Sequence, residues 1–203
     1  MSEQVHTPYL GPNHRAVKGR LWTIGHSTRS IEEFVGLLKS HGVDRVLDVR
    51  LLPGSRRYPH FNAEALAASL SQAGIDYRHL PNLGGRRKAC PDSENLGWKN
   101  ASFRGYADYM AIEGFRLALA EAMALATERP SALLCAEAVP WRCHRSLIGD
   151  ALLAQGWEVL DIIGPGAAKP HRLTAFAKVE GEKVSYPAEG SAQKSLPFEK
   201  RPD

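Results

Sequence analysis

The chain has 203 residues, of which 43% are hydrophobic and 24% charged, and its formal net charge is +4. These values favour a single globular domain and exclude a largely disordered chain. The longest apolar runs are too short to span a bilayer, and residues 1–20 hold no signal-peptide core, so we expect a cytoplasmic protein without a membrane partner. The three cysteines, an odd number, are expected to be reduced thiols.

Both ends of the chain differ in character from its middle. Residues 1–19 show no hydrophobic periodicity, and residues 180–203 are polar and contain three prolines. We expect the first segment to be a flexible arm and the second a disordered tail. Residues 20–179 then form the folded domain.

Between these ends, short apolar runs alternate with amphipathic stretches. Strands are predicted over 21–24, 46–49, 75–80, 132–135 and 159–163, of which the first reads as buried and the third has a weaker apolar pattern. Helices are predicted after the capping residues Ser30 and Asn62, and over 113–128 and 141–155, whereas 81–105 reads as a long loop. This alternation predicts an α/β fold: a single domain with a central, mainly parallel sheet of about five strands, flanked by helices.

Polar and thiol side chains gather where the predicted strands end, which is where such sheets bind ligands. Cys135, Glu137, Cys143 and His144 are the candidates for chemistry. The candidates for holding a substrate are His26, Ser27, Asp48, Arg50, Ser55, Arg56, Arg142 and Arg145. Because all leave the same edge of the sheet, we expect His26, Arg50, Glu137 and Arg145 to converge on one cleft.

Five short motifs at these strand ends resemble, in the same order, a bacterial family named domain of unknown function 488. The motifs are Gly25-His26-Ser27, Asp48-Val49-Arg50, Leu83-Gly84-Gly85-Arg86, Leu134-Cys135-Ala136-Glu137 and Cys143-His144-Arg145. The resemblance covers about residues 21–179. It implies a widespread cytoplasmic α/β protein, and it implies no particular reaction.

A more distant likeness concerns the strand that ends at Cys135 and the helix that follows it. This layout resembles rhodanese-like and cysteine-phosphatase domains. However, the loop from Cys135 to Arg142 holds six residues instead of the five of the phosphatase loop, contains no glycine and carries Glu137. A loop without glycine cannot easily form a backbone nest for an anion.

Cys135 and Glu137 each allow two interpretations. At a strand end, before a helix N-terminus and near Arg142 and Arg145, the Cys135 thiol should have a lowered pKa and act as a nucleophile. Alternatively, it is a packing residue, as buried cysteines often are. Glu137 either forms a salt bridge with Arg142 or Arg145, or acts as a general acid, base or nucleophile.

The sequence predicts neither a metal nor a cofactor. Cys143 and His144 are adjacent in the first turn of a predicted helix, so their side chains should point about 100° apart and not share a ligand. No glycine-rich nucleotide loop is present.

Together these features predict an enzyme, a hydrolase or transferase, acting on an anionic, phosphate-bearing substrate such as a nucleotide or a nucleic-acid end. Two alternatives remain open, and the oligomeric state is undetermined. The first is a nucleic-acid-binding module that uses the aromatic and basic residues of 98–109, with Trp98, Phe103, Tyr106 and Tyr109 stacking on bases. The second is a partner-binding scaffold without catalysis.

Overall fold

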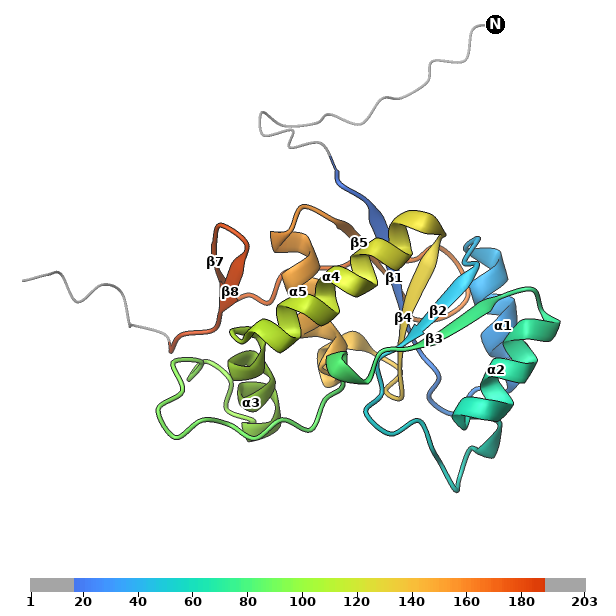
Figure 1. Ribbon diagram of the computed structural model, residues 1–203, viewed down its shortest axis with the longest axis horizontal. Coiled ribbons are helices and arrows are strands. Elements are labelled where there is room, and N and C mark those ends of the chain that lie inside the picture. The colour runs from blue at the N-terminus through green and yellow to red at the C-terminus, as the bar shows by residue number, and fades with distance from the viewer. Residues whose placement is uncertain (1–16, 189–203) are drawn as a thin grey trace, which may run out of the picture.

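A six-stranded sheet lies at the centre of the computed structural model, which describes residues 17–188 (Figure 1). The strands are β1 (Arg20–Gly25), β2 (Arg45–Asp48), β3 (Asp76–His79), β4 (Ser131–Cys135), β5 (Glu158–Ile162) and β6 (Lys169–Pro170). Their order is β3-β2-β4-β1-β5-β6, and all neighbours are parallel except β5 and β6. The predicted α/β fold with a mainly parallel sheet is confirmed, with one short strand more than expected.

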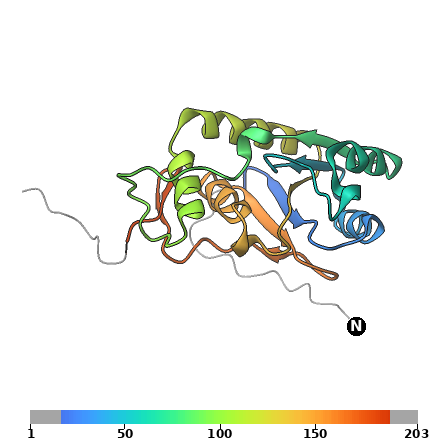
Figure 2. The same cartoon turned by 90° about the horizontal axis from the view of Figure 1, so that it is seen from below.

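Helices cover both faces of this sheet (Figures 1 and 2). They are α1 (Ile31–Ser40), α2 (Ala63–Gln72), α3 (Ala101–Met110), α4 (Glu113–Glu128) and α5 (Arg145–Ala154). One apolar cluster joins the sheet to α1 and α2, and a second joins it to α3, α4 and α5. Neighbouring strand residues alternate between the two, Val46 facing the first and Leu47 the second. Burial on both faces explains why the strands read as continuous apolar runs.

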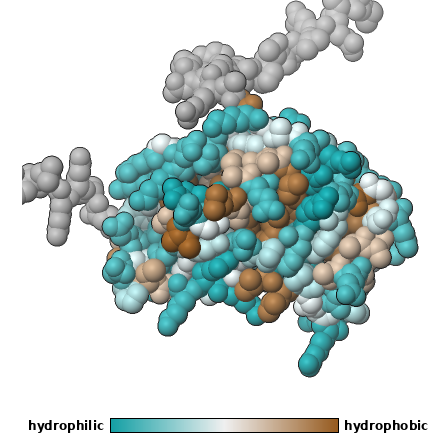
Figure 3. Space-filling view, in the orientation of Figure 1, coloured by the Kyte–Doolittle hydropathy of each residue, from teal (hydrophilic) through white to brown (hydrophobic). Residues whose placement is uncertain are grey.

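The surface of the protein and its helices resemble those of an ordinary globular domain. On the face shown in Figure 3, hydrophobic side chains surface in separate patches among hydrophilic ones. Such patches are normal, because no protein has enough polar surface to cover itself. None of the helices in the described part of the chain has the length and apolar character that crossing a bilayer requires.

The two predicted helix caps behave differently. The Ser30 side chain accepts a hydrogen bond from the backbone N–H of Glu33 at 3.2 Å, as predicted. Asn62 precedes α2, but its side chain makes no capping bond to that helix. Instead, Asn62 Oδ1 accepts from the backbone N–H of Ser55 at 2.6 Å, and this bond holds the loop after β2 against the start of α2.

Two helix boundaries differ from the prediction. The segment predicted as a loop over 81–105 already contains the start of α3, which Asn100 caps through bonds from Ser102 and Phe103. The helix predicted from residue 141 begins only at Arg145, because Pro140–Arg142 forms a 3₁₀ turn. Cys143 and His144 therefore precede the helix.

The chain continues past the sheet into a small hairpin, β7 (Lys178–Glu180) and β8 (Lys183–Ser185). Tyr186 follows it fully buried, and its hydroxyl donates to Asp150 at 2.8 Å. The boundary expected at residue 180 falls inside this hairpin, so the folded part extends at least to Tyr186. Most of the expected arm (1–16) and of the expected tail (189–203) lies outside the described residues.

A buried histidine ties the carboxyl-terminal part of the fold to the sheet. His171 Nδ1 lies 2.8 Å from an Asp161 carboxylate oxygen, and its Nε2 lies 3.4 Å from one of Asp150. Burial alone would lower the pKa of His171, but hydrogen bonding and attraction by the two carboxylates raise it to about 9. The imidazole is therefore charged at neutral pH.

His171→Gln is expected to remove a pH-dependent part of the stability. Since the pKa is raised on folding, from about 6.5 to about 9, the charged imidazole stabilises the fold fully below about pH 6.5. That contribution, on the order of 3 kcal/mol, is lost as the pH rises through about 9. Urea unfolding of both proteins between pH 6 and pH 10 measures it. A gap between wild type and variant that stays constant with pH would contradict this assignment.

Candidate functional site

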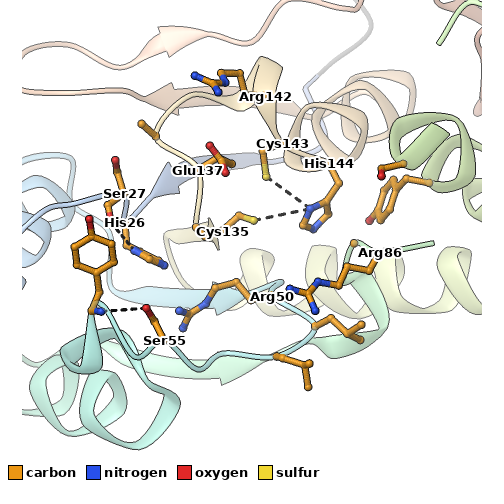
Figure 4. Close-up of a pocket in the computed structure, with 18 of the residues that line it drawn as sticks. His26, Ser27, Arg50, Ser55, Arg86, Cys135, Glu137, Arg142, Cys143 and His144 are labelled. Carbon is orange, nitrogen blue, oxygen red and sulfur yellow. Dashed lines mark hydrogen bonds between the residues drawn. The ribbon is translucent and has the colours of Figure 1, made fainter. Parts of the chain in front are cut away.

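A pocket of about 800 Å³ opens at the carboxyl ends of the central strands (Figure 4). Nine of the twelve candidate residues line it: His26, Ser27, Arg50, Ser55, Cys135, Glu137, Arg142, Cys143 and His144. Asp48, Arg56 and Arg145 do not line it. The pocket thus lies at the edge of the sheet where ligands of parallel α/β proteins bind.

Two thiols and one imidazole meet on the floor of this pocket. His144 Nδ1 lies 3.8 Å from the sulfur of Cys135 and 3.6 Å from that of Cys143. Figure 4 shows the imidazole directed towards both sulfur atoms. Both thiols are largely buried, Cys135 being 7% exposed and Cys143 4%.

This meeting corrects the expectation that Cys143 and His144 point apart. The backbone of Cys143 is extended, with φ −139° and ψ 147°, so the two residues do not have helical spacing. The 3₁₀ turn that begins at Pro140 folds the loop back and returns Cys143 to the end of β4. Cys143 and His144, whose side chains a continuous helix would direct to different sides, therefore both lie next to Cys135.

The orientation of the His144 ring is fixed from its other side. Nε2 lies 3.2 Å from the carbonyl oxygen of Val49, just after β2. An N–H at Nε2 donating to this carbonyl leaves Nδ1 of the neutral ring as a proton acceptor towards the thiols. Gly85 leaves room for the ring, because a Cβ there would lie 3.0 Å from Nδ1. This arrangement of nucleophile, base and orienting group is the one that activates a catalytic cysteine.

The pKa values of the two thiols are shifted in opposite directions. A hydrogen bond from the Cys143 thiol, with His144 and the charge of Arg145 adding to it, holds the pKa of Cys135 well below its ordinary value, although burial opposes the shift. The same hydrogen bond and burial raise the pKa of Cys143. These opposite shifts favour the thiolate form at Cys135 and the protonated form at Cys143.

Arg145 lies beneath the pocket, where it cannot contact a substrate, contrary to expectation. Its side chain is fully buried, and Nη2 donates to the backbone carbonyl of Glu137 at 3.2 Å. Nε and Nη1 have no hydrogen-bond partner, and no ion pair among residues 17–188 includes Arg145. The positive charge of Arg145 thus acts on the thiols from within the protein.

Arg50 lines the pocket, but Asp48 already balances its charge. The guanidinium donates to both Asp48 oxygens, at 2.8 and 2.6 Å, and to the carbonyl of Phe61 at 2.8 Å. Asp48 also accepts a bond from the Tyr77 hydroxyl at 2.7 Å. The structural ion pair is therefore the better interpretation of Asp48 and Arg50, and the pair shapes the pocket wall.

His26 and Ser27 form the wall beside the end of β1. The His26 ring stacks on Phe61 with centroids 4.3 Å apart, and burial, with the charge of Arg50 acting in the same direction, lowers its pKa. A neutral imidazole thus faces the pocket. Ser27 has a φ of +50°, in the left-handed region that costs a residue with a Cβ energy, while its N–H bonds the carbonyl of Ala136 at 2.9 Å.

Glu137 is exposed at the pocket rim. The ion pair with Arg142 or Arg145, one of the two interpretations of Glu137, is not among those formed by the described residues. Arg145 bonds the backbone carbonyl of Glu137 and leaves its carboxylate to the pocket.

Arg86 is a pocket residue that the sequence analysis left out of its candidates. It is exposed, lines the pocket opposite Cys135 and has a φ of +62°. Figure 4 shows Arg86 and Arg50 reaching in from the same wall. The Leu-Gly-Gly-Arg motif that contains Arg86 was the feature of the sequence from which this residue could have been identified as a candidate. Neither Arg86 nor Arg142 belongs to an ion pair of the described residues, so both charges are available to a ligand.

The aromatic residues of 98–109 mostly pack inside the protein. Trp98 stacks on Phe103 at 4.7 Å between centroids, and Tyr106 is fully buried with its hydroxyl donating to the carbonyl of Leu83. Arg87 covers the ring of Tyr109 at 3.7 Å. These ring faces are occupied by protein groups and leave little for stacking on bases.

The same two thiols and imidazole are donor atoms that suit a soft metal ion. Cys135, Cys143 and His144 place their ligand atoms within 4.8 Å of one another, although their spacing in the sequence gave no sign of it. A closed structural zinc site needs four protein ligands, and the described residues add no fourth to this cluster.

A protein-family model matches much of the chain. The model described as "Domain of unknown function DUF488" matches residues 30–152, which include most of the pocket. No curated protein and no solved structure matches the chain.

Proposed function

Since the chain belongs to the DUF488 family, whose description names no reaction, we propose a function from the pocket itself: an enzyme that uses the Cys135 thiolate as a nucleophile on an anionic substrate. The contact between Cys135, Cys143 and His144 on the pocket floor carries this proposal. A packing cysteine needs no oriented imidazole beside it and no uncompensated buried arginine behind it.

The pocket offers what an anionic substrate needs. Arg86 and Arg142 both line the pocket and form no ion pair among the described residues, so each charge is available to an anionic group of a substrate. The volume of about 800 Å³ accommodates a ligand of nucleotide size.

The reaction proceeds by covalent catalysis in this proposal. The Cys135 sulfur bonds the electrophilic atom of the substrate, and the leaving group departs with its bonding electron pair, taking a proton from the Glu137 carboxyl or a His144 imidazolium. Glu137 or His144 then accepts a proton from water or from a second acceptor molecule. The deprotonated acceptor attacks the intermediate and breaks its bond to sulfur. A hydrolase and a transferase differ only in that acceptor.

Backbone strain supports the assignment of this pocket as functional. Among residues 17–188, the two residues other than glycine with a positive φ are Ser27 and Arg86, and both line the pocket. Strain of this kind costs about 1–3 kcal/mol per residue and gathers at functional sites, where geometry matters more than stability.

Arg86→Gly is expected to weaken anion binding while stabilising the fold. Removing the side chain takes away one charge, and glycine relieves the φ of +62° by about 1 kcal/mol. Arg86→Lys, the matched control, keeps the charge and the strain. Thermal unfolding measures the stability, and sulfate binding by calorimetry measures the anion site. Equal sulfate affinity in wild type and Arg86→Gly would contradict the role of Arg86.

A pair of alkylating reagents tests the whole proposal at once. Iodoacetate is anionic and iodoacetamide neutral, so an anion site beside a thiolate favours the first. Relative to the exposed Cys90, Cys135 should prefer iodoacetate by roughly tenfold, equal to about 1.4 kcal/mol of attraction. Sulfate should slow the reaction of Cys135 and leave that of Cys90 unchanged. The same reagent preference at both cysteines would overturn the proposal.

A further inference from the structure

We propose that Cys135 and Cys143 form a reversible intramolecular disulfide, in which Cys143 is the thiol that resolves sulfur adducts of Cys135. The inference rests on the Cys135 thiolate of the proposed function and assigns Cys143 a separate role. It makes the pocket a site of thiol–disulfide exchange with small disulfides.

The positions of the two sulfur atoms support this role. Both contact the same atom, His144 Nδ1, and they lie within 4.8 Å of each other. Cys143 belongs to the extended stretch between the 3₁₀ turn and α5, and its sulfur accepts a hydrogen bond from the backbone N–H of Arg145 at 3.5 Å. Cys90 is exposed and lines neither this pocket nor the cluster, so it takes no part.

Each step of the exchange is balanced. The Cys135 thiolate attacks one sulfur of glutathione disulfide, forming a mixed disulfide and releasing one glutathione thiolate. The Cys143 thiol then gives its proton to His144 Nδ1 and attacks the Cys135 sulfur. The Cys135–Cys143 disulfide forms, and the second glutathione leaves as a thiolate that takes the proton from His144. Two protein thiols are oxidised, and one small disulfide is reduced to two thiols.

The surroundings make this disulfide easy to reduce again. In the dithiol state the buried positive charge of Arg145, whose Nε and Nη1 have no hydrogen-bond partner, favours the Cys135 thiolate. The disulfide removes that negative charge and leaves Arg145 uncompensated. Stabilising the reduced form in this way makes a disulfide more oxidising.

Peptide mass spectrometry under non-reducing conditions tests the proposal. The Cys90→Ser protein, which keeps only the two pocket thiols, is treated with oxidised glutathione and compared with Cys90→Ser/Cys143→Ser. We expect a linked Cys135–Cys143 peptide in the first protein, reversed by dithiothreitol. In the second protein we expect a stable mixed disulfide of glutathione with Cys135.

Two other outcomes of this experiment are possible, and each contradicts a different claim. If both proteins accumulate the mixed disulfide equally, Cys135 is reactive but Cys143 does not resolve it, and only this inference fails. If neither protein gains an adduct and iodoacetamide also fails to label folded Cys135, the thiolate of the proposed function is wrong as well.

Discussion

Replacing Gly25 with alanine is expected to destabilise the protein by about 3 kcal/mol or more. Gly25 ends β1, and a Cβ at this position would fall on the backbone carbonyl oxygen of Glu137. It would also lie 3.0 Å from Nη1 of the buried Arg145. Backbone cannot move aside as a flexible side chain can, so the loop from Cys135 to His144 must shift.

Gly36→Ala is the matched control for this change. Gly36 lies exposed in α1, and a Cβ there meets nothing within 4 Å. Alanine is the better helix former, so this variant should be stabilised by up to about 1 kcal/mol. Urea unfolding compares both variants with wild type. Gly25→Ala with wild-type stability would contradict the close approach of the loop to β1.

Cys135→Ser is expected to abolish turnover, lowering the rate at least about 10³-fold, because it removes the nucleophile and keeps the size of the side chain. The measurement is a panel of aryl phosphates, nucleoside phosphates and thiosulfate, assayed with wild type and variant. Cys90→Ser, at an exposed position away from the pocket, should retain the full rate.

The panel also separates the two candidate nucleophiles at the pocket. Turnover that survives in Cys135→Ser but disappears in Glu137→Gln would make the Glu137 carboxylate the nucleophile and Cys135 a packing residue. Circular dichroism of each variant confirms that a loss of turnover is not a loss of fold.

The sheet and the location of the pocket were predictable from local sequence patterns. Apolar runs mark β1, β2, β4 and β5, the more polar β3 gives a weaker signal, and parallel pairing sends the ends of all five strands to one edge. Nine of the twelve candidate residues consequently line one pocket. Asn100 and the residues after it also carried a helix signal, which the glycines and polar residues upstream obscured.

The features missed depend on contacts between distant residues or on backbone conformations that the sequence does not reveal. The helix was predicted from residue 141 onward, whereas Pro140 begins a 3₁₀ turn that brings Cys143 back to Cys135. Arg86 adopts a left-handed conformation that favours glycine or asparagine, so no propensity predicts it. The burial of Tyr186 depends on Asp150, 36 positions away.

Iodoacetamide labelling of the folded protein against pH, read site by site by mass spectrometry, tests the Cys135 thiolate most directly. The structure predicts that Cys135 labels well below pH 8.5, where an ordinary thiol is mostly protonated, with Cys90 as the exposed reference. Slow labelling of Cys135 at every pH, recovered only on unfolding, would contradict the thiolate and make Cys135 a packing residue. Labelling that appears only after a chelator is added would contradict it too, by showing that the cluster holds a metal.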